Sequence, residues 1–497
     1  MELIIKLLPE LILSVAIIAS ILSISIKDRG YYFFLILIFS LIFTTFSLIS
    51  QLFLINQLGL DDISVFIGSV KIYEIGYFEI VSKILFSIIS VLIIAICSVY
   101  FRDDNGNVGG YEHRYFKLEY GPLLLTVLLG AFVLVSASDL LTFLIGFELV
   151  SIPSYFVIAL DNKNKIALEG SIKYFLIGSV STISIILGIL IFYIFNGSFS
   201  YEVNLSNLYL LSLKVAFLLI FVGVILKMGV FPFSFWIQDA YYASRTPYLL
   251  LISTLPKYAV VLALVKILFY LQTQYFKVLV PILSILSMIF GVYWALNQID
   301  IKKLIAFSTV FNMGFALIPL VGFSGDLTNK AYILSLLNFY LFQYILSTVL
   351  VVGVLVYLEE KFDATDVIKL KGTLDKGGFL TSLFVVGLLS LAGLPPTVGF
   401  IAKFLVLAFS YKFNPFLVIV AIIFSVVSLY YYYRIAKELY VEKDSQITYT
   451  SDTWSLKNYL SYYTSMIIIG FLLIFFGLFP YFVTNVFYSL SLFFIGF

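Results

Sequence analysis

The sequence predicts an all-α membrane protein of about fourteen transmembrane helices, and three observations lead to that fold class. Of its 497 residues, 62% are apolar and only 12% are charged, and the mean hydropathy is +1.09. A water-soluble domain carries roughly 25% charged residues. The apolar residues are gathered in runs of about 20, the length that crosses a bilayer as a helix. Because lipid cannot satisfy free backbone polar groups, these runs must form helices.

We expect the helices to be joined by short polar connections, with only a tight turn near residues 136–139 between the fourth and the fifth. The expected segments are 3–26, 31–55, 79–101, 120–137, 138–160, 169–195, 208–232, 245–271, 277–297, 302–322, 331–358, 379–409, 415–436 and 459–490.

The basic residues alternate from one connection to the next. Odd-numbered connections carry 18 of the 30 Lys and Arg residues, whereas the N-terminus and the even-numbered connections carry five. Positive charge marks the cytoplasmic side of a membrane protein. We therefore expect both termini to face outward, in a prokaryotic plasma membrane or a mitochondrial inner membrane.

Few side chains in this chain can hold a redox centre. It has one cysteine, Cys97, and one histidine, His113. One cysteine cannot ligate an iron–sulfur cluster, and one histidine cannot provide both axial ligands of a haem. We expect neither cofactor nor metal in the chain, and the net charge of +2 gives no reason to expect nucleic acid as a partner.

An internal repeat appears when the chain is shifted by 164 residues. The shift places Gly229 on Gly393 and Pro232 on Pro396, which follows Pro395, in the segments FVGVILKMGVFPF and VVGLLSLAGLPPTVGF. Proline interrupts a helix because it lacks the backbone donor and clashes with the preceding turn. Paired broken helices in two halves of a chain indicate an ion site in transporters. We expect the two halves to have opposite topology.

Five ionisable residues lie well inside the apolar runs: Glu148, Lys173, Lys227, Lys257 and Lys403. A charge at the bilayer centre costs about 2.5–3.5 kcal/mol on insertion scales, and such residues usually mark an ion path. We expect carbonyl groups freed at the helix breaks to stabilise Lys227 and Lys403, and we expect Glu148 to pair with Lys173. Buried lysines give up their protons more readily and can pass them on.

Three further lysines, Lys83, Lys214 and Lys266, lie nearer the ends of the predicted helices. A lysine in that position can extend its flexible side chain to the membrane surface. We therefore leave these residues out of the predicted ion path.

A resemblance to a known family rests on seven motifs in a fixed order. They are GFELVSIPSY, ALEGSIKYFLIGS, LKMGVFPFSFWIQDAYYASRTP, STLPKYA, LIAFSTVFNMGF, LAGLPPTVGFIAKF and SLYYYYRI. In this order and spacing they resemble subunit N of the proton-translocating NADH–quinone oxidoreductase, respiratory complex I. The chain is also similar to the mitochondrial subunit 2 of that complex, and more widely to antiporter-like subunits of the Mrp type.

The resemblance implies a function and roles for single residues. It implies a translocase subunit that moves protons while partner subunits carry the flavin, the iron–sulfur clusters and the quinone. Glu148 would pair with Lys173, Lys227 would be the central proton-binding residue, Lys257 would link the halves, and Lys403 would belong to the exit half-channel. The expected partners are other membrane subunits, including other antiporter-like subunits, and the lipid bilayer.

The resemblance also divides the chain. It implies three N-terminal helices in 1–119, a first repeat of helices four to eight in 120–271, and a second, inverted repeat of helices nine to thirteen in 277–436. The remaining 437–497 would hold a cytoplasmic loop and helix fourteen. Ser234 and Asn312 stand where the family often has histidine, so the link between the lysines must use hydroxyl groups or water.

Two other interpretations remain open. The same motifs occur in cation/proton antiporters and in membrane-bound hydrogenase subunits, and neighbouring genes would distinguish these from complex I. A solute transporter or a structural scaffold is the third interpretation, but a scaffold does not explain five charges inside the membrane. The sequence leaves open whether H⁺ or Na⁺ is moved, and which electron donor and quinone are used.

Overall fold

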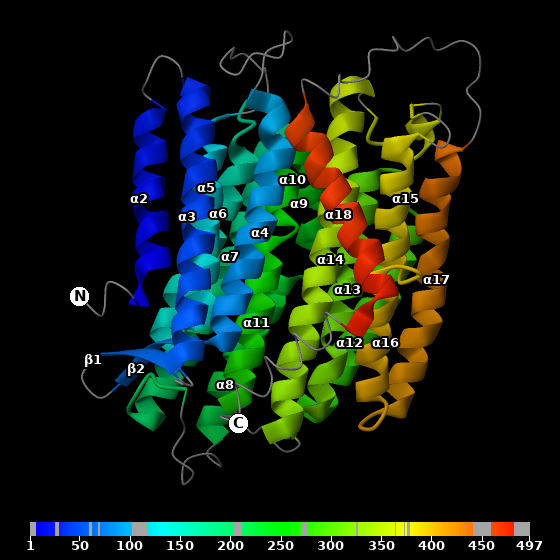
Figure 1. Ribbon diagram of the computed structural model, residues 1–497. Helices are drawn as coiled ribbons and strands as arrows, with labels where there is room; N and C mark the ends of the chain where they lie inside the picture. Colours follow the sequence, from blue (N-terminus) through cyan, green and yellow to red (C-terminus); the bar gives the residue numbers. More distant parts are fainter. Residues whose placement is uncertain are drawn as a thin grey trace.

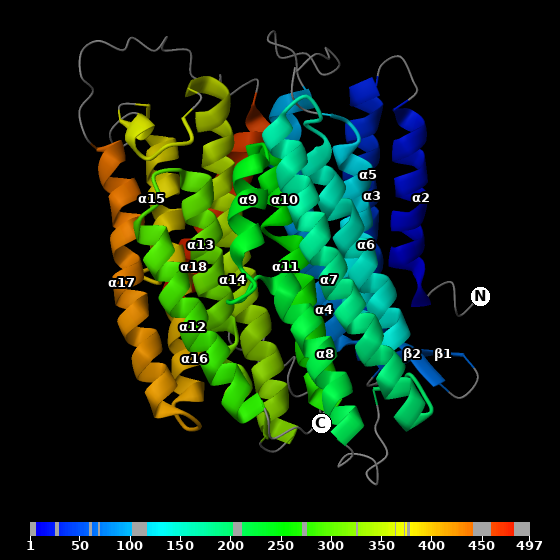
Figure 2. The same ribbon diagram turned by 180° about the vertical axis from the view of Figure 1, so that it is seen from behind.

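A computed structural model describes most of the chain as a bundle of helices that stand side by side (Figure 1 and Figure 2). The described residues are 6–24, 29–58, 62–67, 70–101, 117–201, 211–270, 276–324, 327–362, 364–371, 373–374, 378–440 and 459–481. His113, most of the predicted loop after residue 437 and the predicted helix ends beyond residues 6 and 481 lie outside the described residues.

The N-terminal part contains helices and one small sheet that the sequence did not predict. The elements are α2 (Leu8–Ser23), α3 (Arg29–Leu58), strands β1 (Asp62–Ile67) and β2 (Val70–Gly76), α4 (Tyr77–Cys97) and the 3₁₀ turn η1 (Ser98–Phe101). The two strands form an antiparallel hairpin. Residues Ile72 to Ile75 alternate between partly exposed and buried positions with the period of a strand, but this stretch is too short to separate from a polar connection in sequence alone.

The next part of the chain covers the residues that were predicted as the first repeat. It contains α5 (Tyr120–Ser136), α6 (Leu140–Ala159), α7 (Lys165–Asn196), α8 (Leu211–Met228), α9 (Phe235–Ala243), α10 (Thr246–Ile252) and α11 (Leu255–Tyr270). The side chain of Asp139 caps α6 by accepting hydrogen bonds from the N–H groups of Leu141 and Thr142. This cap explains why the tight turn predicted near residues 136–139 ends one helix and starts another.

The part of the chain predicted as the second repeat also consists of helices, with two 3₁₀ turns between them. It contains α12 (Phe276–Leu296), α13 (Ile301–Ala316), η2 (Ile318–Ser324), α14 (Leu327–Phe362), η3 (Ile368–Leu370), α15 (Phe379–Ala392), α16 (Val398–Ser410) and α17 (Pro415–Leu439). The last helix, α18 (Leu460–Leu478), lies obliquely across the bundle (Figure 1) and contacts α4, α14, α15 and α16.

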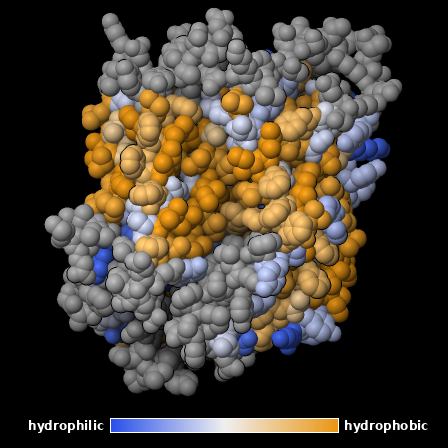
Figure 3. All heavy atoms as spheres, viewed as in Figure 1, coloured by the Kyte–Doolittle hydropathy of each residue, from blue (hydrophilic) through white to orange (hydrophobic). Residues whose placement is uncertain are grey.

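The chain is a multi-pass integral membrane protein. Among the described residues, eleven stretches are long and apolar enough to cross a membrane, and α2, α5, α15 and α16 are shorter apolar helices. An apolar band covers the middle of the face shown in Figure 3. Large apolar side chains such as Phe43, Phe46 and Phe471 are more than half exposed there, as expected of a surface that lies against lipid.

Each of the fourteen predicted segments coincides with a helix or with two consecutive helices. The twelfth segment is divided into α15 and α16, and the eighth into α10 and α11, where the break precedes Pro256. Helix α9 lies after the seventh segment, which was predicted to end at residue 232. Proline at this position is compatible with the first turn of α11, where its missing N–H would have no partner in the helix.

Basic residues of the odd-numbered connections meet acids and carbonyl groups of other odd-numbered connections. Arg245 bonds to Asp161 at 3.0 Å, Lys302 to Glu359 at 2.6 Å, and Arg434 donates to the carbonyl oxygen of Leu296 at 2.9 Å. The connections that carry most of the positive charge therefore lie at one end of the bundle. Which side of the membrane that end faces stays a prediction.

Candidate functional site

The first broken helix lies between α8 and α9. Helix α8 ends at Met228, and Gly229 takes a positive φ of 73°. The N–H groups of Gly229 and Val230 both donate to the carbonyl oxygen of Ile225, at 3.1 and 3.3 Å. The free N–H of Phe231 donates to the Ser287 hydroxyl group on α12 at 3.0 Å. The chain then turns through a cis Phe231–Pro232 bond into α9.

The second broken helix, between α15 and α16, repeats this pattern 164 residues later. Helix α15 ends at Ala392, and Gly393 has a φ of 80°. The N–H groups of Gly393 and Leu394 both donate to the carbonyl oxygen of Leu389, each at 3.0 Å. A cis Pro395–Pro396 bond leads into α16. Both glycines are needed because a side chain at a positive φ is strained.

Lys227 lies in the last turn of α8, against two tyrosine rings. Its side chain is buried, and its Nζ donates a hydrogen bond of 3.3 Å to the hydroxyl group of Tyr155 on α6. The same nitrogen lies 4.4 Å from the ring centre of Tyr155 and 4.5 Å from that of Tyr174 on α7. The faces of aromatic rings attract a cation. The predicted carbonyl partners are absent here, because the indole N–H of Trp236 occupies the carbonyl oxygen of Leu226.

Lys403 lies beyond its break, in α16, and turns back toward it. Its Nζ donates to the carbonyl oxygens of Leu391 and Ala392, at 2.7 and 3.1 Å. The last carbonyl groups of a helix have no partner within it and carry partial negative charge. The freed carbonyl groups that the sequence predicted beside Lys403 are therefore present. The rings of Phe311 and Phe315 complete its surroundings.

Lys257 lies in the first turn of α11, between the two halves. It is buried, and its Nζ donates a hydrogen bond to the hydroxyl group of Tyr241 on α9. In the contacts among the described residues, neither Lys227 nor Lys257 nor Lys403 is joined to a carboxylate.

The structure separates the predicted pair of Glu148 and Lys173. Glu148, half-buried on α6, accepts a hydrogen bond of 2.6 Å from the Thr182 hydroxyl group. Lys173 bonds instead to Glu169 at 2.8 Å and to Asp239 at 3.0 Å, and its side chain is 46% exposed. Lys173 lies only eight residues from the start of α7, about 12 Å along the helix, so it is not at the middle of the bundle. Glu148 is close enough to Lys227 to attract its charge.

Hydroxyl groups surround the two positions where the family often has histidine. Ser234 is buried, and its hydroxyl group has no hydrogen-bond partner among the described residues. Asn312 accepts a hydrogen bond of 3.1 Å from the hydroxyl group of Tyr340, and its amide group donates to the carbonyl oxygen of Ser308 at 2.8 Å. Ser308 in turn bonds to Tyr432 on α17.

The tyrosines of this site were not found by sequence reasoning. Tyr155, Tyr174 and Tyr241 are contacts of the lysines, but tyrosine occurs 36 times in the chain and none of these three stands beside the lysine that it contacts. Asp239 was also missed, although it is the one acid in an otherwise apolar segment after the first break. A single acid in such a segment was the signal in the sequence that could have identified Asp239.

The prediction that Lys83 and Lys266 reach the membrane surface is wrong. Both are buried, Lys83 against Glu10 at 2.7 Å and Lys266 against Glu79 at 2.7 Å. The three N-terminal helices and the hairpin cover these side chains and supply carboxylates, so extension to the surface is unnecessary. In the described part of the chain, no three His, Cys, Asp or Glu residues come together as metal ligands.

This combination of features defines a class of protein. Two broken helices with matching hydrogen bonds, each beside a buried lysine in a membrane-spanning bundle, are typical of an antiporter-like ion-translocating subunit. The profile of the NADH:quinone oxidoreductase/Mrp antiporter transmembrane family matches residues 137–428, and the chain therefore belongs to that family.

Relatives of the chain are subunits of one respiratory enzyme. NADH-quinone oxidoreductase subunit N of Francisella tularensis is 29% identical and covers 96% of both chains. Subunit N of Cupriavidus taiwanensis is 33% identical over 76% of this chain and 78% of its own.

Solved structures share the fold. A chain of respiratory complex I from Thermus thermophilus has a TM-score of 0.73 at 24% identity, covering 95% of this chain and 97% of its own. A chain of the Mrp complex from Dietzia sp. has a TM-score of 0.80 at 15% identity, covering 97% of this chain and 96% of its own. At these identities the similarity concerns the fold alone.

Proposed function

We propose that this chain is the proton-translocating membrane subunit of a complex I-like quinone oxidoreductase. Quinone reduction itself belongs to the whole complex, and the flavin, the iron–sulfur clusters and the quinone belong to partner subunits. We place the chain in a prokaryotic plasma membrane with both termini outside. Its relatives are subunits of this bacterial enzyme.

One observation carries the proposal: three lysines are buried inside the bundle with hydroxyl or carbonyl partners. Lys227, Lys257 and Lys403 are 4%, 2% and 5% exposed. A buried lysine without a counter-ion is costly as a cation. Such a group exchanges its proton when a charge nearby changes, whereas a lysine built only to hold helices together would be ion-paired.

The contacts give each residue a part in the transfer. A charge change in a neighbouring subunit alters the field at Glu148, which acts on Lys227. Lys227 can pass its proton toward the Tyr155 hydroxyl group, 3.3 Å away. Lys257 connects the halves through Tyr241, and Lys403 receives the proton beside the carbonyl groups of the second break. Lys173 holds α7 against α9 through Asp239 and sets the position of Tyr174, its neighbour in sequence.

A lysine substitution tests this function in the assembled complex. Lys227→Ala should leave the subunit in the complex and lower the number of protons moved per electron, because the central exchanging group is gone. The ratio is measured in proteoliposomes that contain the whole complex, with a pH-sensitive dye and quinone reduction followed together. Lys412→Ala, at an exposed lysine between α16 and α17, is the matched control.

An unchanged ratio in the assembled Lys227→Ala complex would contradict the proposal. A cation/proton antiporter is the second candidate function, because the family whose profile matches residues 137–428 also includes Mrp antiporters. That function predicts sodium efflux driven by a pH gradient and independent of quinone. Sodium transport without any electron donor would therefore support the second candidate.

A further inference from the structure

A cluster of buried charges lies away from the lysines of the proposed path, where the hairpin and α4 meet α11. The Nζ of Lys266 on α11 lies 2.7 Å from Glu79 on α4 and 3.0 Å from Glu74 on β2, and it donates to the carbonyl oxygen of Val135 at 3.1 Å. Both Lys266 and Glu79 are 1% exposed. One cation thus faces two carboxylates.

The cluster is connected to the surface by a short series of ion pairs. Glu74, 13% exposed, lies 3.1 Å from Lys71, whose side chain is 30% exposed at the edge of the hairpin. The exposed fraction of the side chain falls from Lys71 through Glu74 to Lys266 and Glu79. Consecutive members of this series are in direct contact. Burial raises the pKa of Glu74, but Lys266 and Lys71 outweigh it and hold that pKa below its usual range. Glu74 therefore stays ionised, and Glu79 is the acid that can take up a proton.

The cluster also reaches the helix that carries Lys257. Lys266 and Lys257 both belong to α11, nine residues and about 14 Å apart along the axis. One turn beyond Glu79, the Ser82 hydroxyl group accepts a hydrogen bond of 3.0 Å from Asn338 on α14, and Asn338 accepts one from Tyr258, the neighbour of Lys257. Since the region is buried, a charge that changes at Glu79, the partner of Lys266, is poorly screened from Lys257.

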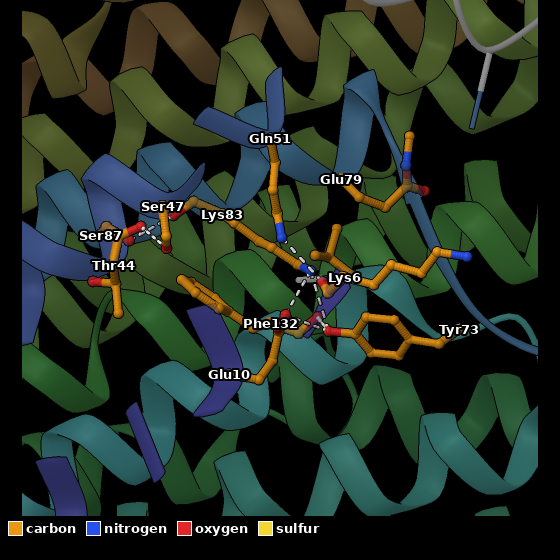
Figure 4. A network of polar contacts seen from close by, with 12 residues as sticks. Lys6, Glu10, Thr44, Ser47, Gln51, Tyr73, Glu79, Lys83, Ser87 and Phe132 are labelled. Carbon is orange, nitrogen blue, oxygen red and sulfur yellow. Dashed lines mark hydrogen bonds and ion pairs between the residues drawn. The ribbon is translucent and has the colours of Figure 1, made fainter. Parts of the chain in front are cut away.

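A second ion pair lies beside the first. Glu10 on α2 accepts hydrogen bonds from Lys83 at 2.7 Å and Tyr73 at 2.6 Å. Figure 4 shows these three side chains converging, with Glu79 on the same helix as Lys83. This pair joins α2 to α4 and the hairpin. In its contacts among the described residues it has no partner at the surface comparable to Lys71, so it serves as an internal control.

We propose that Glu74, Glu79 and Lys266 form a second proton-loading site, which exchanges protons with the hairpin end of the bundle and adjusts the charge felt by Lys257. Loading places one proton on Glu79 and leaves Lys266 protonated, so the cluster gains one positive charge. That charge favours release of the proton held at Lys257. Unloading releases that proton to water at the hairpin end of the bundle.

A structural role alone is the competing explanation. Glu79 also caps α4 by accepting from the N–H of Gly76 at 3.0 Å. A buried ion pair is, however, weak as a source of stability, and apolar residues of similar size often serve as well. The inference rests on the proposed function, because it requires that Lys257 exchanges protons.

Glu79→Gln tests the proposal in the assembled complex. Glutamine keeps an oxygen that can accept from Lys266 and from the N–H of Gly76, and Lys266 keeps Glu74 as its counter-ion, but the amide cannot take up a proton. A purely structural contact would therefore largely survive the change. We expect normal assembly, retained quinone reduction and a proton-to-electron ratio about as low as that of Lys227→Ala. Glu10→Gln, the matched change in the neighbouring pair, should leave the ratio unchanged.

A second variant distinguishes loss of the loading site from loss of the folded structure. In the Glu79→Gln, Lys266→Gln double variant, two amides can bond to each other without charge. We expect this variant to assemble and to keep the low ratio. A normal ratio in Glu79→Gln, or a normal ratio in the double variant, would overturn the second loading site. If Lys227→Ala lowers the ratio while Glu79→Gln does not, the proposed function stands and only this inference fails.

Discussion

The two broken helices share their backbone and differ in the surroundings of their lysines. At both breaks a glycine with positive φ and the residue after it donate to the same carbonyl group of the preceding turn. Lys227, however, precedes its break and lies under tyrosine rings within reach of the field of Glu148. Lys403 follows its break and bonds to the carbonyl groups that the break sets free.

This difference shows that the same kind of helix break, with a glycine at positive φ, can support two kinds of lysine site. The first half places its lysine within the field of one acid, Glu148 on α6. In the second half Asn312, which lies 164 residues after Glu148, replaces the acid with a neutral amide. The first lysine therefore responds to charges outside the chain, and the second depends on the geometry of its own break.

The largest expected effect comes from a methyl group at the second break. A Cβ at residue 393 would lie 2.7 Å from Cδ of Lys403, whereas one at residue 229 would lie 1.9 Å from Cδ1 of Ile237. Both Gly393→Ala and Gly229→Ala should lose roughly 1–2 kcal/mol of stability because of the positive φ. Only Gly393→Ala displaces the lysine, and it should abolish most proton translocation.

Gly197→Ala is the control for this pair, because its φ is 75° and nothing lies within 4 Å of the added Cβ. Thermal unfolding measures the loss of stability that a side chain at positive φ causes in all three variants. Proteoliposome assays measure the rate of proton translocation. Equal transport in Gly393→Ala and Gly229→Ala would remove the distinction between the two lysine sites.

The next effect concerns the acid of the first half. Glu148→Gln keeps an oxygen that accepts from Thr182 but removes the charge that acts on Lys227. We expect translocation to fall about tenfold, the consequence of losing about 1.4 kcal/mol of interaction. Thr182→Val keeps the charge and removes only the hydrogen bond, so its effect should be several times smaller. A greater loss in Thr182→Val than in Glu148→Gln would show that the charge is not what matters.

A smaller effect is expected from the tyrosine at Lys227. Tyr155→Phe keeps the ring that faces the cation and removes the hydroxyl group that receives its hydrogen bond. A neutral hydrogen bond of this kind contributes about 1 kcal/mol, so translocation should slow a few-fold, with normal assembly. The transport rate of the purified complex measures this, and an unchanged rate would mean that the proton leaves Lys227 by another group.

The smallest effect separates the two breaks without touching a lysine. Phe231 has an N–H group that bonds to Ser287, but the equivalent residue in the second half is Pro395, which has none. Ser287→Ala should therefore cost about 0.5–1 kcal/mol of stability, because a partly buried donor loses its partner. Denaturation in detergent measures this loss, and a variant as stable as the parent would mean that another group satisfies Phe231.

The sequence was sufficient for those features that depend on composition and on proline and glycine. Runs of apolar residues located the helices, and the spacing of Gly229, Pro232, Gly393 and Pro396 located both breaks. The partners of buried charges were not predictable, because they come from distant segments. Lys173 was assigned to Glu148, which is 25 positions away, although its partner Asp239 is 66 positions away on α9. The β1–β2 hairpin was not predicted because its strands are short and partly polar.

The central claim is that the two halves form one proton path, in which Lys227 and Lys403 act in series. The most direct test is the proton-to-electron ratio of the assembled complex with Lys227→Met, with Lys403→Met and with both substitutions. A path in series predicts that each single variant lowers the ratio as far as the double variant does. Two partial losses that add up in the double variant would mean two separate paths and would contradict the account.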